Sequence, residues 1–351
     1  MSGSVKPGYA RALDIKRGRV DLGHGGGGRA MVQLVREVFA RHLGNPWLAQ
    51  GNDGALLPPV PGRLVVSTDS HVVSPLFFPG GDIGCLAVHG TINDLAVMGA
   101  TPLWITAGFI IEEGFPLSDL DRIAASMARA CRESGVALVA GDTKVVEKGK
   151  GDGLFITTTG IGAAAKDVTL SGDQARPGDA VLLSGTVGDH GMAIMSRREN
   201  LGFDAPIQSD TAPLCGLTAM LMARAGDTLR LMRDPTRGGL AATVNEIAHQ
   251  AQVGIVLDES SIPVRPEVEA ACELLGLDPL NVANEGKLVL VCAESGADAL
   301  LETMREHPLG RDAARIGSVI ADDRHFVQMR TCLGGHRMVD WLNAEQLPRI
   351  C

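Results

Sequence analysis

Short apolar runs typical of β-strands alternate with helical patterns along both halves of this 351-residue chain. Branched apolar runs at Leu103–Ile111 and Ala180–Ser184 indicate buried strands, and apolar residues recur at helical spacing between such runs. The clearest expected helices are Cys215–Ala225, Pro266–Leu275 and Ala297–Glu306. This alternation predicts domains of the α/β or α+β class.

A glycine- and proline-containing segment, Ser171–Asp179, separates the two halves and is the expected domain boundary. The second half restarts with a strand at Ala180–Ser184 and an expected turn at Gly185–Gly191. We divide the chain into an arm, glycine-rich loop and helix (1–44), an N-terminal domain (45–170), a C-terminal domain (171–338) and a tail (339–351).

Charge and composition exclude several classes of protein. The formal net charge is −9, which argues against nucleic acid as the main partner because phosphate binding needs a basic surface. The charge still permits a nucleotide that is bound through a metal ion. Seven scattered cysteines without a CxxC pair predict neither a disulfide framework nor a zinc site. With no signal-like N-terminus and no apolar run of membrane-spanning length, we expect a soluble, cytoplasmic protein.

A run of four glycines follows His24 and precedes a helical pattern that extends to about Leu43. The main-chain N–H groups of Gly25, Gly26 and Gly27 could line an anion site, and phosphate often binds where a glycine loop opens a helix. A plain hinge is the better explanation when the run is considered alone.

Acidic residues stand beside Gly, Ser, Thr, Asn or Pro in turns or near the ends of expected elements. Asp69, for example, directly follows the expected strand Leu64–Thr68. The set comprises Asp53, Asp69, Asp94, Asp142 and Asp234. Turns favour Asp, which would explain any single member, but five together favour a magnesium–nucleotide site. No Walker A pattern occurs, so any use of ATP belongs to another architecture.

Three further residues are candidates for chemistry. Lys144 lies close to Asp142 and could hold a phosphate or act as a base, and Glu285 could take a proton at close range. For each of the two alone, a solvated surface charge is the better explanation. The chain ends in Cys351, behind Pro348, so a thiol on a mobile arm could carry a small group into a pocket, although a frayed end is the simpler explanation.

Longer motifs carry a resemblance to a known family. They resemble HypE, the carbamoyl dehydratase family of [NiFe]-hydrogenase maturation, within the PurM-like (aminoimidazole ribonucleotide synthetase) superfamily. The matching segments are His24–Gly28, Thr68–Gly84, Asn93–Ala96, Gly141–Val146, Arg233–Gly239 and Pro348–Cys351. The resemblance implies a two-domain PurM-like α+β fold. Its N-terminal half-barrel domain would bind ATP and pair in a homodimer, its C-terminal domain would be an α/β sandwich, and its tail would be flexible.

The resemblance also implies a reaction. A HypF-like carbamoyltransferase would load a carbamoyl group onto Cys351, and ATP would phosphorylate the carbamoyl oxygen. Loss of phosphate and a proton would leave S-cyanate on Cys351. The cyanide would then pass to iron on a HypC–HypD-like scaffold.

Individual roles follow from the matching positions. Lys144 and Glu285 match positions that deprotonate the carbamoyl nitrogen, with Cys351 as the acceptor. Five acids match positions for magnesium and nucleotide: Asp53, Asp69, Asp94, Asp142 and Asp234. The remaining expected ATP-binding residues are Gly25, Gly26, Gly27, Asn93, Thr143, Thr236 and Arg237. His89 departs from the family pattern, in which a smaller residue or a cysteine is expected.

Two alternatives stay open on the sequence. Another PurM-like ATP-dependent kinase or synthetase would have no need of a terminal cysteine. A metal-carrying maturation chaperone would use His24, His71, His89 and thiols, but their spacing fits no recognised zinc pattern. Binding of Mg-ATP or of a soft metal would distinguish the enzyme from the carrier.

Overall fold

Two β-sheets organise the computed structural model, which describes residues 12–199, 207–341, 347 and 349–351. The N-terminal half holds a four-stranded sheet in the order β1-β6-β4-β5. Its strands are β1 (Arg63–His71), β4 (Thr101–Glu112), β5 (Ala137–Val146) and β6 (Leu154–Ala164). A short hairpin, β2 (Phe77–Phe78) and β3 (Gly81–Asp82), lies between β1 and the first long helix.

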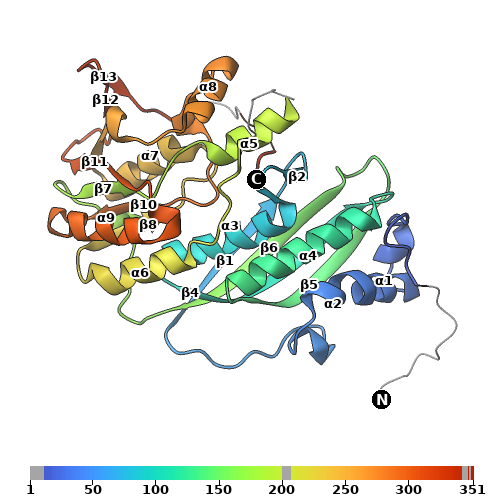
Figure 1. Cartoon of the computed structure of the whole chain (residues 1–351). Helices are drawn as coiled ribbons and strands as arrows, with labels where there is room; N and C mark the ends of the chain where they lie inside the picture. The colour runs from blue at the N-terminus through green and yellow to red at the C-terminus, as the bar shows by residue number, and fades with distance from the viewer. Residues whose placement is uncertain (1–11, 200–206, 342–346, 348) are drawn as a thin grey trace.

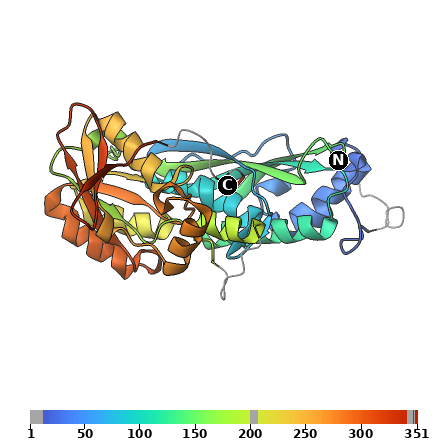
Figure 2. The same cartoon turned by 90° about the horizontal axis from the view of Figure 1, so that it is seen from above.

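The C-terminal half holds a seven-stranded sheet in the order β13-β12-β9-β11-β7-β10-β8. Its strands are β7 (Ala180–Leu183), β8 (Leu229–Arg233), β9 (Gly254–Asp258), β10 (Val289–Cys292), β11 (Ala314–Ile320), β12 (Val327–Arg330) and β13 (His336–Met338). Figure 2 shows the two halves side by side, with the C-terminus between them.

One face of the four-stranded sheet is covered by helices (Figure 1). Helix α3 (Ile83–Val97) packs on β1 and β6, and α4 (Leu117–Glu133) packs on α3. Helices α1 (Arg29–Leu34) and α2 (Ala40–Leu43) are joined by a π-helical segment, Val35–Phe39, that also contacts α4.

The opposite face of the four-stranded sheet is exposed. Along β1 the side chains alternate, so Ser67, Asp69 and His71 face α3 while Leu64 and Val66 point away and are 63% and 61% exposed. We call this second face the open face. An apolar open face is a surface on which another chain can pack.

Both faces of the seven-stranded sheet are covered. Val289 and Val291 of β10 pack with α7 (Gly239–Ala251), whereas Leu290 and Cys292 pack with α6 (Cys215–Ala225) and α9 (Ala297–Glu306). Helices α5 (Asp189–Arg198) and α8 (Pro266–Leu275) contribute to the core of the N-terminal half instead, so they join the two halves. None of the described helices has the length and apolar character that a membrane span needs.

The expected turn at Gly185–Gly191 is wrong in its second part, because α5 begins at Asp189. Gly188 precedes that helix with φ 87°, a left-handed conformation that glycine adopts without strain. The expected strand end before Asp69 is also wrong. Strand β1 continues to His71 and β5 continues through Asp142 to Val146, so both acids lie inside strands.

Candidate active site

The described end of the tail is docked at the junction of the two halves (Figure 1). Leu347 and Ile350 are buried and belong to the hydrophobic core cluster that also contains residues of α5 and α8. The main-chain N–H groups of Val72 and Ser74 donate to the carbonyls of Cys351 and Arg349, each at 3.0 Å. The thiol is therefore held in place here, although we expected a mobile arm, and Pro348 lies outside the described residues.

Charged groups surround the Cys351 thiol. The positive charge of the Arg237 guanidinium and the negative charges of Glu285 and Asp69 lie close enough to influence it. Burial raises the pKa of Cys351 to about 12, the negative charge of Glu285 adds to this, and Arg237 opposes it. The thiol is thus protonated at neutral pH, and Arg237 is positioned to stabilise negative charge at this point.

Three of the predicted acids converge beside this thiol. Asp69 comes from β1, Asp94 from α3 and Asp234 from the loop before α7. Ser67 Oγ donates to Asp94 Oδ2 at 2.5 Å, and Thr91 Oγ1 donates to Asp69 Oδ2 at 3.1 Å.

Burial and the nearby negative charges raise the pKa of two of these acids, Asp94 and Asp234. Burial raises the pKa of Asp94 to about 6, and the charge of Asp69 adds to the shift. Burial likewise raises the pKa of Asp234 to about 7, with a contribution from Asp94. A cation bound among these carboxylates would relieve their repulsion.

Carboxylate oxygens are the ligands that magnesium prefers, so the donor chemistry of these three acids fits this ion. The geometry is less complete. Among the residues that the structure describes, no three His, Cys, Asp or Glu side chains are already arranged to hold a metal ion. Magnesium would therefore need oxygen atoms from its other ligands, as it does when it binds nucleotide phosphates.

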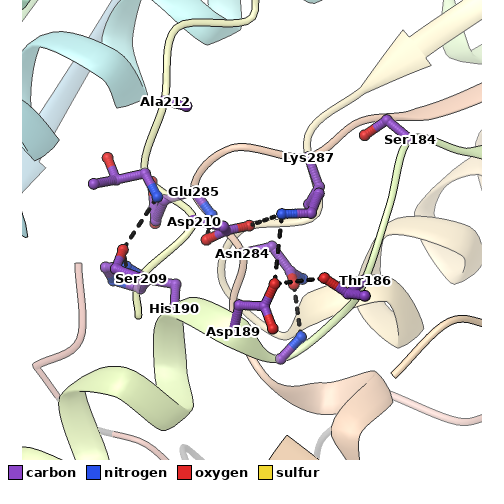
Figure 3. A network of polar contacts seen from close by, with 12 residues as sticks. Ser184, Thr186, Asp189, His190, Ser209, Asp210, Ala212, Asn284, Glu285 and Lys287 are labelled. Carbon is purple, nitrogen blue, oxygen red and sulfur yellow. Dashed lines mark hydrogen bonds and ion pairs between the residues drawn. The ribbon is translucent and has the colours of Figure 1, made fainter. Parts of the chain in front are cut away.

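A buried polar network holds the loop that carries Glu285 (Figure 3). Its main-chain N–H donates to Asp210 Oδ1 at 3.0 Å, and Lys287 Nζ lies 3.0 Å from Asp210 Oδ2. Burial raises the pKa of Glu285 well above its ordinary value, and the charges of Asp234 and Asp210 add to this. A carboxylate in this setting has a high affinity for a proton.

Lys144 and Asp142 form a second group on the open face. Lys144 Nζ lies 2.6 Å from Asp142 Oδ2, and the side chains are 63% and 60% exposed. The hydrogen bond from Lys144 lowers the pKa of Asp142. Because β5 and β1 are opposite edges of a four-stranded sheet, these strands are about 14 Å apart. One chain therefore does not bring Lys144 together with Glu285 and Cys351.

The glycine loop belongs to this second group. A side chain at Gly25 would place its Cβ 2.6 Å from the main-chain nitrogen of Val145 in β5, so only glycine permits this approach. Gly26 and Gly27 follow at the surface. A cavity of about 260 Å³ opens nearby, and its lining includes Phe39, Asn45, Phe109, Leu138, Asp142 and Thr143.

A second cavity, of about 450 Å³, lies between the two halves. It is lined by Ser67 and Asp94 from the N-terminal half and by Arg233 and Asp234 from the C-terminal half. Asp53 is exposed in a bend before β1, and no described contact joins it to the other acids.

Comparison with known proteins identifies this arrangement. Residues 51–164 match the family model "AIR synthase related protein, N-terminal domain", and residues 176–330 match "AIR synthase related protein, C-terminal domain". The chain is 64% identical to carbamoyl dehydratase HypE of Cupriavidus necator, over 100% of both chains. The chain belongs to the HypE family of carbamoyl dehydratases.

Solved HypE structures have the same fold. A crystal structure of HypE in complex with ATP has a TM-score of 0.91 and 51% sequence identity, and the match covers 94% of this chain and 99% of that one. HypE in a HypE–HypF complex has a TM-score of 0.77 at 51% identity, covering 88% and 99%. The predicted family, PurM-like two-domain fold and enzyme class are therefore confirmed.

In this HypE family member, Asn93 has a role that the sequence did not indicate. Its amide nitrogen donates to the carbonyls of Ala212 and Glu285 at 3.0 and 3.2 Å, and its amide oxygen accepts from the N–H of Leu214 at 2.8 Å. The side chain therefore ties α3 to the Glu285 loop, and these described bonds occupy both ends of its amide.

Four buried residues near Glu285 were not predicted for the HypE site: Asp189, His190, Asp210 and Lys287. They come from α5, from the segment that follows residues 200–206, and from the loop before β10. Each lies in an ordinary polar sequence, and only the fold brings the four together. No local pattern distinguishes them from surface residues.

Proposed function

We propose that this chain dehydrates an S-carbamoyl group on its own Cys351 to an S-cyanate, at the expense of ATP, and so supplies the cyanide ligand of the [NiFe]-hydrogenase iron. The observation that carries the proposal is the docking of the terminal thiol beside Arg237 and Glu285. A frayed end would have no such surroundings. The carbamoyl dehydratase name of close relatives supports the same reaction.

The reaction balances in two steps. The carbamoyl oxygen attacks the γ-phosphorus of ATP, ADP leaves, and the nitrogen loses one proton, which gives S–C(=NH)–O–phosphate. Loss of the second N–H proton and of inorganic phosphate then forms the C≡N bond. The cysteine sulfur stays bonded to this carbon throughout, and no oxidant is needed.

Glu285 is the proposed base for the carbamoyl nitrogen. It is 4% exposed, so a carboxylate formed there is poorly hydrated and binds a proton strongly. Arg237 lowers the pKa of Glu285 and provides the positive charge that favours the ionised carboxylate. Arg237 would also stabilise the charge that develops on the carbamoyl oxygen and the transferred phosphoryl group.

Burial of the thiol protects the activated carbon. Leu347 and Ile350 fill the core beside the site, and this restricts access of water to the iminophosphate. Attachment to the protein's own tail raises the effective concentration of the substrate group. Both features favour elimination over hydrolysis.

We propose that Asp69, Asp94 and Asp234 hold Mg²⁺ with the ATP phosphates, and that Thr236 and Arg237 bind the nucleotide beside them. The ion would supply positive charge for phosphoryl transfer. The HypE–ATP crystal structure supports ATP as the nucleotide.

In this proposal, the residues on and near the open face act only when a second copy of the chain pairs with this one. Asp142 and Thr143 line the cavity of about 260 Å³, and Gly26, Gly27, Lys144 and Asp53 are exposed. Pairing of two open faces in a homodimer would give these residues a buried neighbour. Asp53, Asp142 and Lys144 would then act on nucleotide or carbamoyl groups at the paired surface.

Two partners complete the proposal. The HypE–HypF crystal structure supports a HypF-like carbamoyltransferase as the donor. A HypC–HypD-like scaffold would accept the cyanide, in the cytoplasm.

Mass spectrometry of the C-terminal peptide tests the proposal. After incubation with ATP and a HypF-like donor system, Cys351 should gain first a carbamoyl group and then a cyano group. The Cys351→Ala protein should gain neither, while Cys332→Ala, which removes an exposed thiol, should behave as wild type. A carbamoyl group mapped to another cysteine would contradict the proposal.

A further inference from the structure

His190 connects the tail to the body of the protein. It is fully buried at the start of α5, with Nε2 2.7 Å from the carbonyl oxygen of Ile350 and Nδ1 2.8 Å from Ser209 Oγ. A carbonyl oxygen can only accept, so Nε2 carries the proton and donates to Ile350. Nδ1 then accepts the hydroxyl proton of Ser209, whose oxygen accepts the N–H of Thr211 at 3.1 Å. The ring is thus fixed in one tautomer.

The residue after Ser209 reaches the opposite side of the site. Asp210 accepts the main-chain N–H of Glu285 and binds Lys287, and Lys287 Nζ also lies 3.6 Å from Asp189 Oδ2. Figure 3 shows His190, Ser209, Asp210, Glu285 and Lys287 grouped in this network. Two adjacent residues therefore hold the histidine that binds the tail and the loop that carries the proposed base.

We propose that His190 is a positioning residue that locks the tail through the Ile350 carbonyl, and that Ser209–Asp210 couples this lock to the placement of Glu285. The docking role of His190 does not depend on the proposed function. Only its consequence does, which is that the group on Cys351 is aligned with Glu285.

Among the described residues, the other groups that bind the tail do not contact the carbonyl that His190 binds. Val72 and Ser74 bind the carbonyls of Cys351 and Arg349, and Arg198 Nη2 also donates to Arg349 at 2.8 Å. These groups recognise the carbonyls on either side of Ile350. The Ile350 carbonyl is bound by His190, and burial makes an unpaired carbonyl costly. Loss of the ring N–H should therefore favour release of the tail without removing its other contacts.

Reactivity of the Cys351 thiol measures tail release directly. We would treat the full-length protein with N-ethylmaleimide and follow alkylation of the C-terminal peptide by mass spectrometry. His190→Phe keeps a ring of similar size but no N–H, and alkylation should be about tenfold faster, as expected when one buried hydrogen bond is lost. His190→Gln retains an amide donor, so its alkylation rate should stay close to that of wild type.

A matched control replaces a histidine that has no part in the His190 network. His249→Phe changes an exposed side chain on α7 and should leave the alkylation rate unchanged. Ser209→Ala keeps the His190 ring and removes the hydroxyl that fixes its tautomer. It should give a smaller increase, of about two- to threefold, and it serves as the test if His190→Phe does not fold.

The coupling to Glu285 has a separate readout. In single-turnover dehydration of the carbamoylated protein, His190→Phe should lower the rate about tenfold and leave its ATP dependence unchanged, and His190→Gln should restore most of the rate. Folded His190→Phe and Ser209→Ala proteins that are alkylated at the wild-type rate would overturn the inference. So would a Gln variant that reacts as fast as the Phe variant.

Failure of the inference can be distinguished from failure of the proposed function. Alkylation requires neither ATP nor a carbamoyl group, so it reports the lock alone. A carbamoyl group mapped to another cysteine would refute the proposed chemistry and leave the alkylation result standing. Unchanged alkylation with cyanation at Cys351 would refute the lock and leave the chemistry standing.

Discussion

The two faces of the N-terminal sheet carry acidic groups of opposite character. On the helix-covered face, Asp69 and Asp94 are partly buried, and burial and mutual repulsion raise the pKa of Asp94 to about 6. On the open face, Asp142 is exposed and Lys144 lowers its pKa. The first face brings the proposed catalytic groups together within one chain, whereas the second is exposed and is the proposed surface for a partner chain.

This contrast separates residues that the sequence grouped together. Asp69 and Asp142 each follow a run of apolar strand residues, but their side chains point to opposite faces of the same sheet. Side-chain direction in a strand alternates with every residue. The distinction therefore depends on the strand register and on which face of the sheet the helices cover. The positions of the acids in the sequence reveal neither of these.

The largest effect is expected at Glu285, which belongs to the buried group of residues beside Cys351. Glu285→Gln should slow S-cyanate formation by about 10²- to 10⁴-fold, because the proposed base is lost. The fold should persist, since glutamine has nearly the same size and shape as glutamate. Single-turnover mass spectrometry of the carbamoylated protein checks the rate, and alkylation of Cys351 checks that the tail stays docked. A rate within threefold of wild type would remove Glu285 from the chemistry.

The open face is tested by placing a charge on it. Val66 is 61% exposed on this face, and Val66→Glu should weaken the proposed homodimer about a hundredfold, since an unpaired charge in an interface is costly. Sedimentation at micromolar concentration should change from a dimer to a species of 36.7 kDa. Leu333→Glu, at an exposed position in the other half, is the control. Wild-type protein that sediments only as a monomer would contradict the predicted pairing.

Protonation of the enclosed acids should appear in stability. The folded-state pKa of Asp94 is about 6 and its ordinary value is 3.8, so the folded state binds more protons between these values. Stability should therefore decrease as the pH rises from about 4 to about 6, by about 2 kcal/mol. Denaturant unfolding across this range should show the decrease in wild type and a smaller one in Asp94→Asn. Equal pH dependence in the two proteins would contradict the assigned shift.

Elements with a strong local pattern were predictable from the sequence. The helices Cys215–Ala225, Pro266–Leu275 and Ala297–Glu306 are confirmed with the predicted limits. Strand β8, Leu229–Arg233, was not predicted, and α5 was taken for a turn because glycines surround its first residues. Strand β8 has only 5 residues and α5 begins in a glycine-containing segment, so the local signal of each is weak.

The candidate site divides in the same way. Cys351, Arg237 and Glu285 were predicted from motifs, and the structure places these three together. The residues that hold them, His190 and Asp210, were not predicted. His190 is 160 residues from Ile350, and Asp210 is 75 residues from Glu285. Contacts between residues so far apart in the sequence depend on tertiary packing, and no local sequence motif records them.

The smallest effect is expected for the exposed pair on the open face. Asp142→Asn removes one partner of an ion pair in which both groups are more than half exposed, so stability should change by less than about 1 kcal/mol. ATP turnover should nevertheless fall about tenfold at limiting ATP and magnesium, because the proposed nucleotide contact is lost. Asp323→Asn, at another exposed acid, should do neither. Wild-type turnover in Asp142→Asn would mean that the Lys144–Asp142 ion pair binds no nucleotide. Asp142 would then be a surface residue, and the active site would be restricted to the helix-covered face.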